Sequence, residues 1–232
     1  MVRKLVRQEL KRKALVVNTT NNYIDTQEML RAYRSGIFPM AIGKESNSIS
    51  WIRPIKRGII PIGYLHISRS TKKFIRKTEV KSSINTCFKD ILKNCANRED
   101  TWINKPIYES YIRLYELGYA HSVEIWEGSS LAGGLFGISI GSCFFGESMF
   151  SLRPNGSKLA LIFTMASLIY SGYKLFDVQF LTDHLKTMGA KEINNEEYQK
   201  ILSLGLKTES NLLDLSSDYS WSKIIQLNNQ KL

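Results

Sequence analysis

Residues 144–151 read Phe144-Phe145-Gly146-Glu147-Ser148-Met149-Phe150-Ser151, and residues 176–180 read Phe176-Asp177-Val178-Gln179-Phe180. Both runs have the apolar character of buried strands, and an apolar helix pattern at 157–170 separates them. Side chains alternate along a strand, so Asp177 and Gln179 are expected on one face. Buried carboxylates are rare unless they are paired or functional, which leaves two interpretations open. Asp177 and Gln179 either satisfy each other or a loop backbone, or they belong to a functional site together with Glu147 and Ser148.

Around these runs, the periodicity of the chain changes from helical to alternating at about residue 120. Short Gly and Ser turns predict a three-stranded antiparallel meander, with strands at 120–126, 131–140 and 143–150. The elements expected after it are a helix at 157–170, a strand at 174–180, and helices at 182–188 and 195–202. This order is typical of acetyltransferase-like (GNAT) domains. Gly133, Gly134 and Gly137 in the middle strand indicate a bulge or the close approach of a ligand.

The first 117 residues carry helix signals separated by short strand-like runs. Asp25 and Glu28 form a capping box for a helix that Gly36 ends, and an apolar loop is expected at 37–40. The other expected elements are short strands within 48–62 and 80–85, and helices at 68–77, 87–96 and 106–117. We predict an α+β fold in which an N-terminal arm and small α/β domain, residues 1–62, precede a GNAT-like domain, residues 63–232. The Ser- and Asn-rich tail from Thr208 onward is expected to wrap the surface.

Composition and cysteine usage restrict the class of protein. With 232 residues and 43% hydrophobic content, the chain can build one large core or two small ones. No apolar run approaches the roughly 20 residues that a membrane helix needs, and no apolar segment follows the basic N-terminus to make a secretory signal. The three cysteines are an odd number, and no metal-ligand spacing is present. We therefore expect reduced cysteines, no zinc site and a cytoplasmic protein with a solvated basic arm.

The charge of the chain is strongly positive and unevenly distributed. The net charge is +11, and residues 53–81 hold nine basic side chains against one acid, Glu79. This density indicates a polyanionic partner, nucleic acid before membrane, because no long amphipathic apolar face accompanies it. A compositional excess of surface lysine is the alternative explanation.

Six short motifs stand in a fixed order between about Thr26 and Leu202. They are Leu65-His66-Ile67-Ser68-Arg69-Ser70, Asp100-Thr101-Trp102-Ile103, residues 118–126, Gly133-Gly134-Leu135-Phe136-Gly137, residues 145–150, and Asp177-x-Gln179-x-x-Thr182-x-His184. Each is weak alone, but as an ordered set they resemble the bacterial leucyl/phenylalanyl-tRNA-protein transferase family. The resemblance implies an aminoacyltransferase that moves Leu or Phe, with Met as a possible third donor, from aminoacyl-tRNA to proteins with N-terminal Arg or Lys. It thereby implies a role in protein degradation through N-degrons, tRNA as the polyanion, no cofactor, no membrane partner and a monomer.

The family's site residues transfer onto matching positions of this sequence. The catalytic pair falls on Asp177 and Gln179, and the basic positions expected to bind tRNA are Arg69, Lys72, Lys73, Arg76 and Lys77. The substrate-binding positions are Trp102, Phe144, Glu147, Met149, Ser151, Met40, Leu135, Thr164 and Phe176. The chain departs from the family at Met40 and Thr164, where an aromatic residue is common. These departures affect two expectations: the stacking of the adenosine between side chains, and the width of the pocket for the donor side chain.

The chemistry that the resemblance implies needs few groups. An aminoacyl ester is already activated, so the enzyme must hold two substrates together, obtain a neutral amine and stabilise an oxyanion. Asp177 can act as a base directly or through a neighbour, and Gln179 can hold the acceptor or donate to the oxyanion. Glu147 can pair with the cationic acceptor residue or form a structural ion pair, and Trp102 can contact adenosine or belong to the core.

Two other functions fit parts of the sequence. An acyl-CoA-dependent N-acetyltransferase of the same fold would use the loop Arg153-Pro154-Asn155-Gly156-Ser157-Lys158 to hold pyrophosphate, although Lys158 occupies a small-residue position of that motif. A non-enzymatic RNA-binding module would use the basic stretch, but it leaves the pattern of Asp177 and Gln179 unexplained.

Overall fold

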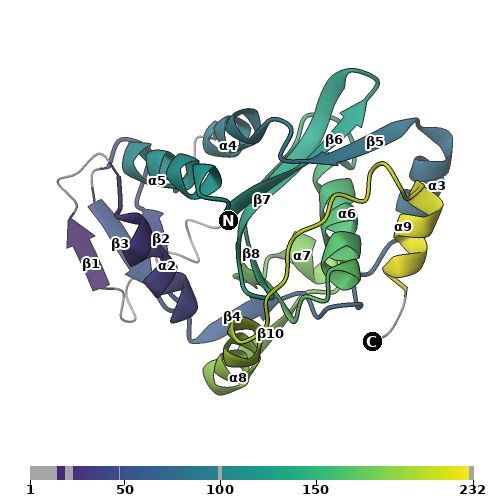
Figure 1. Cartoon of the computed structure of the whole chain (residues 1–232). Helices are drawn as coiled ribbons and strands as arrows, with labels where there is room; N and C mark the ends of the chain where they lie inside the picture. The colour runs from purple at the N-terminus through teal and green to yellow at the C-terminus, as the bar shows by residue number, and fades with distance from the viewer. Residues whose placement is uncertain (1–14, 19–22, 47, 99–100, 230–232) are drawn as a thin grey trace.

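The computed structural model describes residues 15–18, 23–46, 48–98 and 101–229. The expected basic arm at the N-terminus and Asp100 lie outside these residues. Within the described part the strands form two sheets, a small one in the order β1-β3-β2 and a seven-stranded mixed one in the order β10-β4-β9-β8-β7-β6-β5. The fold is therefore of the mixed α+β class (Figure 1).

The small sheet lies at one end of the molecule, beside helix α2 (Thr26–Arg34) (Figure 1). Its strands are β1 (Leu15–Asn18), β2 (Phe38–Ala41) and β3 (Ser48–Ile52), paired antiparallel. The expected capping box is confirmed at the start of α2, where the Asp25 carboxylate accepts from the backbone N–H of Glu28 at 3.0 Å. The expected loop at 37–40 is wrong. All four residues of β2 are buried, so this strand lacks the alternation that marks a strand in sequence.

The large sheet contains the expected meander. Strands β6 (Ala120–Glu127), β7 (Ser130–Ile140) and β8 (Cys143–Ser151) pair antiparallel in sequence order, and β5 (Val80–Ile84) pairs with β6. Strand β9 (Leu175–Gln179) lies parallel to β8, with Phe144 opposite Phe176 and Phe145 opposite Asp177. The other side of β9 is covered by β4 (Lys56–Ile59), and β10 (Lys191–Asn194) pairs with β4 at the sheet edge.

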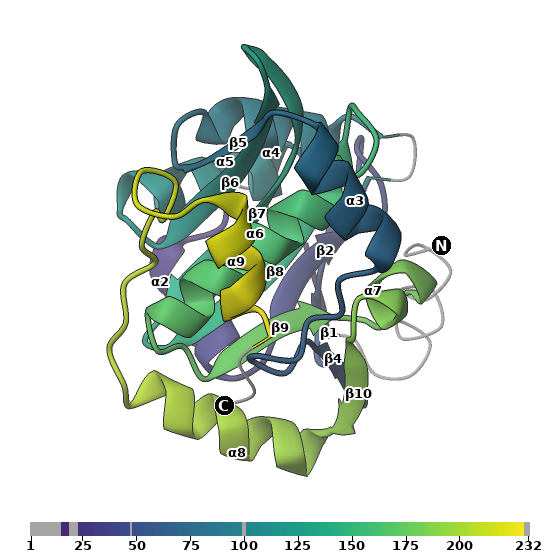
Figure 2. The ribbon, with the colours of Figure 1, turned by 90° about the vertical axis from the view of Figure 1, so that its right-hand side faces the viewer.

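Helices cover both faces of the large sheet (Figures 1 and 2). Helices α4 (Phe88–Ala96), α5 (Lys105–Glu116) and α8 (Asn195–Leu206) pack into one core, which includes Phe145. Helices α3 (Arg69–Lys77), α6 (Gly156–Tyr170) and α7 (Asp183–Thr187) contribute to the other, which includes Phe144. Adjacent phenylalanines thus serve opposite faces, as strand geometry requires.

The glycines of β7 allow a close backbone contact between the sheet and α6. A Cβ on Gly133 would lie 2.7 Å from the Cα of Gly156, and a Cβ on Gly156 would lie 2.3 Å from the carbonyl oxygen of Ala132. The expected bulge is present, because the β7–β8 register shifts between Phe136 and Gly137. At Gly133 the close approach is made by the first turn of α6.

The tail after Thr208 does more than wrap the surface. It ends in α9 (Trp221–Leu227), which packs on α6 and buries Ile224 and Leu227 (Figure 2). The Asn228 amide also donates to the carbonyl oxygen of Ile162 at 3.0 Å. The Ser- and Asn-rich composition of the tail concealed this contribution to the core.

The change from the small sheet to the large one occurs between Ile52 and Lys56. The proposed boundary after residue 62 therefore places β4 in the first unit, although β4 pairs with β9 and β10. None of the helices in the described part of the chain is long and apolar enough to cross a membrane.

Candidate active site

A cavity of about 340 Å³ opens among β2, the segment around Trp102, and strands β7, β8 and β9. Seven of its lining residues belong to the expected set: Met40, Trp102, Leu135, Glu147, Met149, Phe176 and Gln179. Most of the wall is apolar, and the polar side chains that line it include Glu147, Gln179, Arg98, Ser148 and His184. Enclosed apolar space with a few convergent polar groups is typical of small-molecule sites.

Asp177 lies behind this cavity and does not line it. Its carboxylate is fully buried and accepts from Nε of Arg57 at 2.9 and 3.0 Å and from Nη2 at 2.7 Å. The Tyr198 hydroxyl donates to Oδ2 at 2.6 Å, and the backbone N–H of Gln179 donates to Oδ1 at 2.8 Å. Burial opposes the charge of Arg57, but Asp177 more than offsets this and raises the arginine pKa. The carboxylate is therefore a fixed anchor for three different elements.

Gln179 connects this anchor to the cavity. Its backbone has a φ of +56°, in the left-handed region that a residue with a Cβ adopts only at a cost. The hydrogen bond from its N–H to Asp177 holds this conformation at the end of β9. Its side-chain amide donates from Nε2 to Oε1 of Glu147 at 3.0 Å. Asp177 thus determines where the Gln179 amide lies.

Glu147 is a buried carboxylate on the cavity wall, with 8% of its surface exposed. The Tyr111 hydroxyl donates to Oε2 at 2.9 Å, and the hydroxyls of Tyr111 and Tyr33 are 2.9 Å apart. Burial raises the pKa of Glu147 to about 8, although the hydrogen bonds from Tyr111 and Tyr33 lower it. Near neutral pH this carboxyl group can therefore either hold or release a proton.

Three of the expected substrate-binding residues lie away from the cavity lining. Phe144 is fully buried and packs edge-on against Phe176, with ring centroids 5.6 Å apart. Thr164 is fully buried within α6, and its hydroxyl donates to the carbonyl oxygen of Ala160 at 2.8 Å. The residue of α6 that reaches the cavity is Leu161. Phe144 can act on the pocket only by supporting Phe176.

Ser151, the third of these residues, is exposed and holds the start of α6. Its Oγ accepts from the backbone N–H of Ser157 at 2.8 Å and donates to the Ser157 hydroxyl at 3.0 Å. The Gly156 N–H donates to the carbonyl oxygen of Arg153 at 3.2 Å. Two N–H groups of the loop that could hold pyrophosphate are thus used within the protein, which argues against the acetyltransferase alternative.

The sequence analysis missed Arg57, Tyr198, Tyr111 and Tyr33, which support the polar groups of the site. Arg57 was counted with the basic stretch, but only 2% of it is exposed, so it is not part of a polyanion-binding surface. The guanidinium lies 4.8 Å from the ring centroid of Phe38 and 4.7 Å from that of Tyr198. The one available signal was that Arg57 directly precedes the run Gly58-Ile59-Ile60, which has the character of a buried strand.

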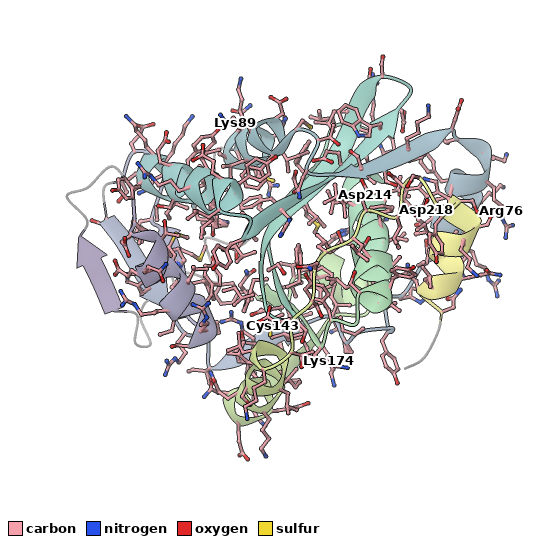
Figure 3. All side chains as sticks on the ribbon, in the orientation of Figure 1. Arg76, Lys89, Cys143, Lys174, Asp214 and Asp218 are labelled. Carbon is pink, nitrogen blue, oxygen red and sulfur yellow. The ribbon has the colours of Figure 1, made fainter. Side chains whose placement is uncertain are left out.

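The expected tRNA-binding residues are together on α3. Arg69, Lys73, Arg76 and Lys77 are exposed and Lys72 is half-buried. In the described part of the chain, none of the five forms an ion pair with an acid. Figure 3 shows Arg76 on the outer side of α3, pointing away from the body of the molecule. This helix is an unneutralised cationic surface.

Comparison with known proteins identifies relatives along most of the chain. The family model for the leucyl/phenylalanyl-tRNA protein transferase matches residues 59–203, and the model for the N-terminal domain of that protein matches residues 23–55. The leucyl/phenylalanyl-tRNA–protein transferase of Dinoroseobacter shibae is 45% identical over 184 residues, which cover 79% of this chain and 82% of the relative. The protein of the same name from Maricaulis maris is 42% identical over 204 residues, or 86% of this chain and 94% of the relative.

Proposed function

The chain belongs to the leucyl/phenylalanyl-tRNA–protein transferase family and is an aminoacyltransferase, and from this premise we propose its substrates and mechanism. The donor is Leu-tRNA or Phe-tRNA, with Met-tRNA as a third. The acceptor is the α-amino group of a protein that begins with Arg or Lys, and the product is an N-degron for proteolysis. The observation that carries this proposal is the apolar cavity into which the Glu147 carboxylate and the Gln179 amide project.

The apolar part of the cavity fits the donor side chain. Leu135, Met149, Phe176 and Leu161 offer a wall without charge, in which a Leu or Phe side chain is stabilised and a charged one would be buried unpaired. Trp102 is half-buried at this cavity, and its ring packs edge-on 6.2 Å from that of Tyr111. An indole held in this way gives the terminal adenine of tRNA a stacking surface.

The polar part of the cavity fits the acceptor. An N-terminal Arg or Lys residue carries an α-ammonium group and a cationic side chain, and Glu147 in its ionised form supplies a negative countercharge. Tyr111 donates to one of its oxygens and Gln179 to the other, and a carboxylate has further lone pairs that the incoming residue can use. Ser148 and Met149, which follow Glu147 in the sequence, also line the cavity.

In the proposed mechanism Gln179 and Asp177 have different roles. The Gln179 amide touches the reacting groups, where it orients the acceptor or donates to the oxyanion of the tetrahedral intermediate. Asp177 acts through Gln179, because its carboxylate is enclosed by Arg57, Tyr198 and the Gln179 backbone. The reaction requires no cofactor, since the aminoacyl ester is already activated.

Architecture and charge support the rest of the proposal. The β6–β7–β8 meander, followed by α6 and the parallel strand β9, supports a GNAT-like arrangement of the larger part of the chain. The five basic residues of α3 support tRNA as the polyanionic partner. We propose that the protein acts as a cytoplasmic monomer, with tRNA and the acceptor protein as its partners.

The test is the transfer of a labelled acyl group to one Arg-initiated peptide. We expect labelled Leu-tRNA to modify the peptide and labelled acetyl-CoA to leave it unmodified. The same peptide with an acetylated N-terminus serves as the control, because it has no free α-amine. Modification by acetyl-CoA but not by Leu-tRNA would overturn the proposed function.

A further inference from the structure

We propose that Glu147 accepts the proton of the acceptor's α-ammonium group, so that the neutral amine forms inside the cavity. This inference rests on the proposed function and deepens it. It assigns Glu147 a catalytic role in addition to attraction of a positive charge. It also identifies which of the two positive groups of an N-terminal Arg or Lys residue the carboxylate faces.

The position of Glu147 is the first argument. Among the residues that line the cavity, all within the described part of the chain, Glu147 is the one carboxylate. The nearby Asp177 does not line the cavity, and both of its oxygens are occupied by Arg57, Tyr198 and the Gln179 backbone. His184 lines the cavity too, but burial and the charge of Lys158 lower its pKa, which makes it a weaker proton acceptor than Glu147. Glu147 is thus the base best placed to meet an incoming ammonium group.

The hydrogen bonds of Glu147 fix its orientation. Tyr111 on α5 donates to one carboxylate oxygen and Gln179 on β9 donates to the other. The Gln179 amide therefore lies beside the proton-accepting group, and an amine that contacts Glu147 is also held near Gln179. This arrangement places the nucleophile beside the group that donates a hydrogen bond to the oxyanion, so the bound substrates are already close to the geometry of the reaction.

The electrostatic surroundings match the proton affinities of the two groups. Burial raises the pKa of Glu147 to about 8; Tyr33 and Tyr111 oppose the increase through hydrogen bonds, Asp177 adds to it and Arg57 opposes it. An α-amino group has a pKa of about 7.7 to 8.0. Proton transfer between groups of similar pKa is nearly balanced in free energy, so the neutral amine is well populated in the complex.

The reaction balances with Glu147 in this role. One proton moves from the α-ammonium group to the Glu147 carboxylate, and the freed nitrogen lone pair forms the N–C bond to the ester carbonyl carbon. The bond from that carbon to the ribose oxygen then breaks, and a second proton passes from the nitrogen to the leaving oxygen. The products are an amide and a tRNA with a free terminal hydroxyl group. Glu147 releases its proton to solvent, so one proton is produced in each cycle.

The test compares kcat of the wild type and Glu147→Gln at saturating Arg-initiated peptide from pH 6.5 to 9. With glutamine the bound amine must lose its proton without help, so kcat follows the neutral fraction of the amine. That fraction is about a tenth at pH 7 and nine-tenths at pH 9 for a pKa near 8. In the wild type, the ammonium group of the bound acceptor favours the ionised form of Glu147 and lowers its pKa in the complex, so the carboxylate can still accept a proton at pH 7. We expect the variant to be about tenfold below the wild type at pH 7 and within about twofold at pH 9.

Two controls separate this role from others. Glu116→Gln makes the same change at an exposed position at the end of α5 and should leave the profile unchanged. Should Glu147→Gln fail to fold, Tyr111→Phe removes a hydrogen bond that lowers the pKa of Glu147. The pH below which kcat falls should then be higher in this variant than in the wild type. An unchanged value would overturn the inference.

The possible results distinguish the inference from the proposed function. A deficit that is constant across the pH range would mean that Glu147 only attracts the acceptor, and equal rates at pH 7 would remove it from the reaction. Either result overturns the proton-transfer role alone. A wild type that moves no Leu to the peptide at any pH would overturn the proposed function and this inference with it.

Discussion

Arg57 and Asp177 are 120 residues apart in sequence and form a bidentate ion pair in the interior, with nitrogen–oxygen distances of 2.7 to 3.0 Å. The pair joins β4 to β9, and the Arg57 guanidinium also donates to the carbonyl oxygen of Gly36 at 2.9 Å. Two side chains thus link the turn after α2, the large sheet and the cavity residue Gln179. Removing one partner leaves a buried charge without compensation.

Asp177→Asn is expected to lower both stability and transfer. The buried Arg57 would lose its counter-charge, which costs about 3 to 5 kcal/mol of unfolding free energy. Transfer should fall at least about a hundredfold, because asparagine has one acceptor oxygen where Arg57, Tyr198 and the Gln179 N–H use two, so the anchor of Gln179 is disturbed. Urea unfolding and peptide transfer measure the two effects.

The double variant Arg57→Met with Asp177→Asn separates the two effects. It should unfold less readily than the sum of the single changes predicts, because no unpaired charge remains. It should still transfer slowly, because the neutral amide that replaces the carboxylate is a weaker hydrogen-bond acceptor for the Gln179 N–H. Near-normal turnover of either Asp177 variant would exclude Asp177 from the mechanism.

Tyr198→Phe tests whether the orientation of Asp177 matters for activity. It removes a 2.6 Å hydrogen bond to the carboxylate but keeps the ring beside Arg57. Tyr173→Phe is a matched control, since the Tyr173 hydroxyl lies 2.6 Å from that of Ser139, away from the cavity lining. Each change should cost about 1 to 3 kcal/mol of stability, and only Tyr198→Phe should lower kcat. Equal kcat values for the two variants would contradict a positioning role for Tyr198.

Local patterns in the sequence were sufficient to place β8 and β9 and to put Asp177 and Gln179 on one strand. They were also sufficient for helix starts near residues 68, 106 and 182, where the side-chain oxygens of Ser68, Asn104 and Thr182 accept from the first turn. They failed at β2, whose four residues are all buried, and at α9, which is seven residues long. A strand buried on both faces and a short helix carry too little periodicity to be recognised.

The residues that support the site could not be predicted from the sequence, and the reason is a different one. The role of Arg57 depends on Asp177, 120 residues away, and isolated arginines are normally assigned to the surface. Tyr33, Tyr111 and Tyr198 look like apolar helix residues, and their hydroxyl partners lie on other elements. Polar networks across elements are properties of the tertiary structure. The assignment of Thr164 to the pocket failed in the same way, because a helix pattern does not show which face meets the cavity.

The raised pKa of Glu147 predicts a pH dependence of stability. Its value of about 8 exceeds that of an unfolded glutamate, so the folded state binds a proton more tightly. The associated stability is present at low pH and is lost as pH rises from about 4.5 through 8. Glu147→Gln removes this loss. The free energy of unfolding of the variant, relative to that of the wild type, should therefore increase by roughly 1 kcal/mol for each pH unit in that window. Urea unfolding at pH 5 to 8.5 tests this, and Glu116→Gln should show no such trend.

The basic face of α3 is expected to bind tRNA through its phosphates. Replacing Arg69, Lys72, Lys73 and Arg76 with Gln should weaken binding and flatten the slope of log affinity against log salt by about 0.7 to 0.9 for each lost contact. The control replaces four exposed lysines elsewhere: Lys89, Lys93, Lys191 and Lys207. Figure 3 shows Lys89 on α4, well away from Arg76. Equal slopes for the two variants would assign the effect to net charge alone.

Leu161, and not Thr164, is expected to determine the size of the pocket for the donor side chain. Leu161 lines the cavity from α6, whereas Thr164 on the same helix is fully buried and does not line it. Leu161→Ala should enlarge the pocket and move selection from Leu toward Phe, by about tenfold or more, since a lost methyl or methylene is worth about 1 to 3 kcal/mol in such a pocket.

Thr164→Phe adds a large ring to a filled core, so it should destabilise the protein by about 1 to 3 kcal/mol or more without narrowing acceptance directly. The measurement is competition between Leu-tRNA, Phe-tRNA and Ile-tRNA for one Lys-initiated peptide, with thermal unfolding of each variant in parallel. Ile should remain the poorest donor, because its branched Cβ widens the side chain close to the ester. A Leu to Phe ratio that changes with Thr164→Phe and stays constant with Leu161→Ala would show that the pocket wall on α6 lies at residue 164.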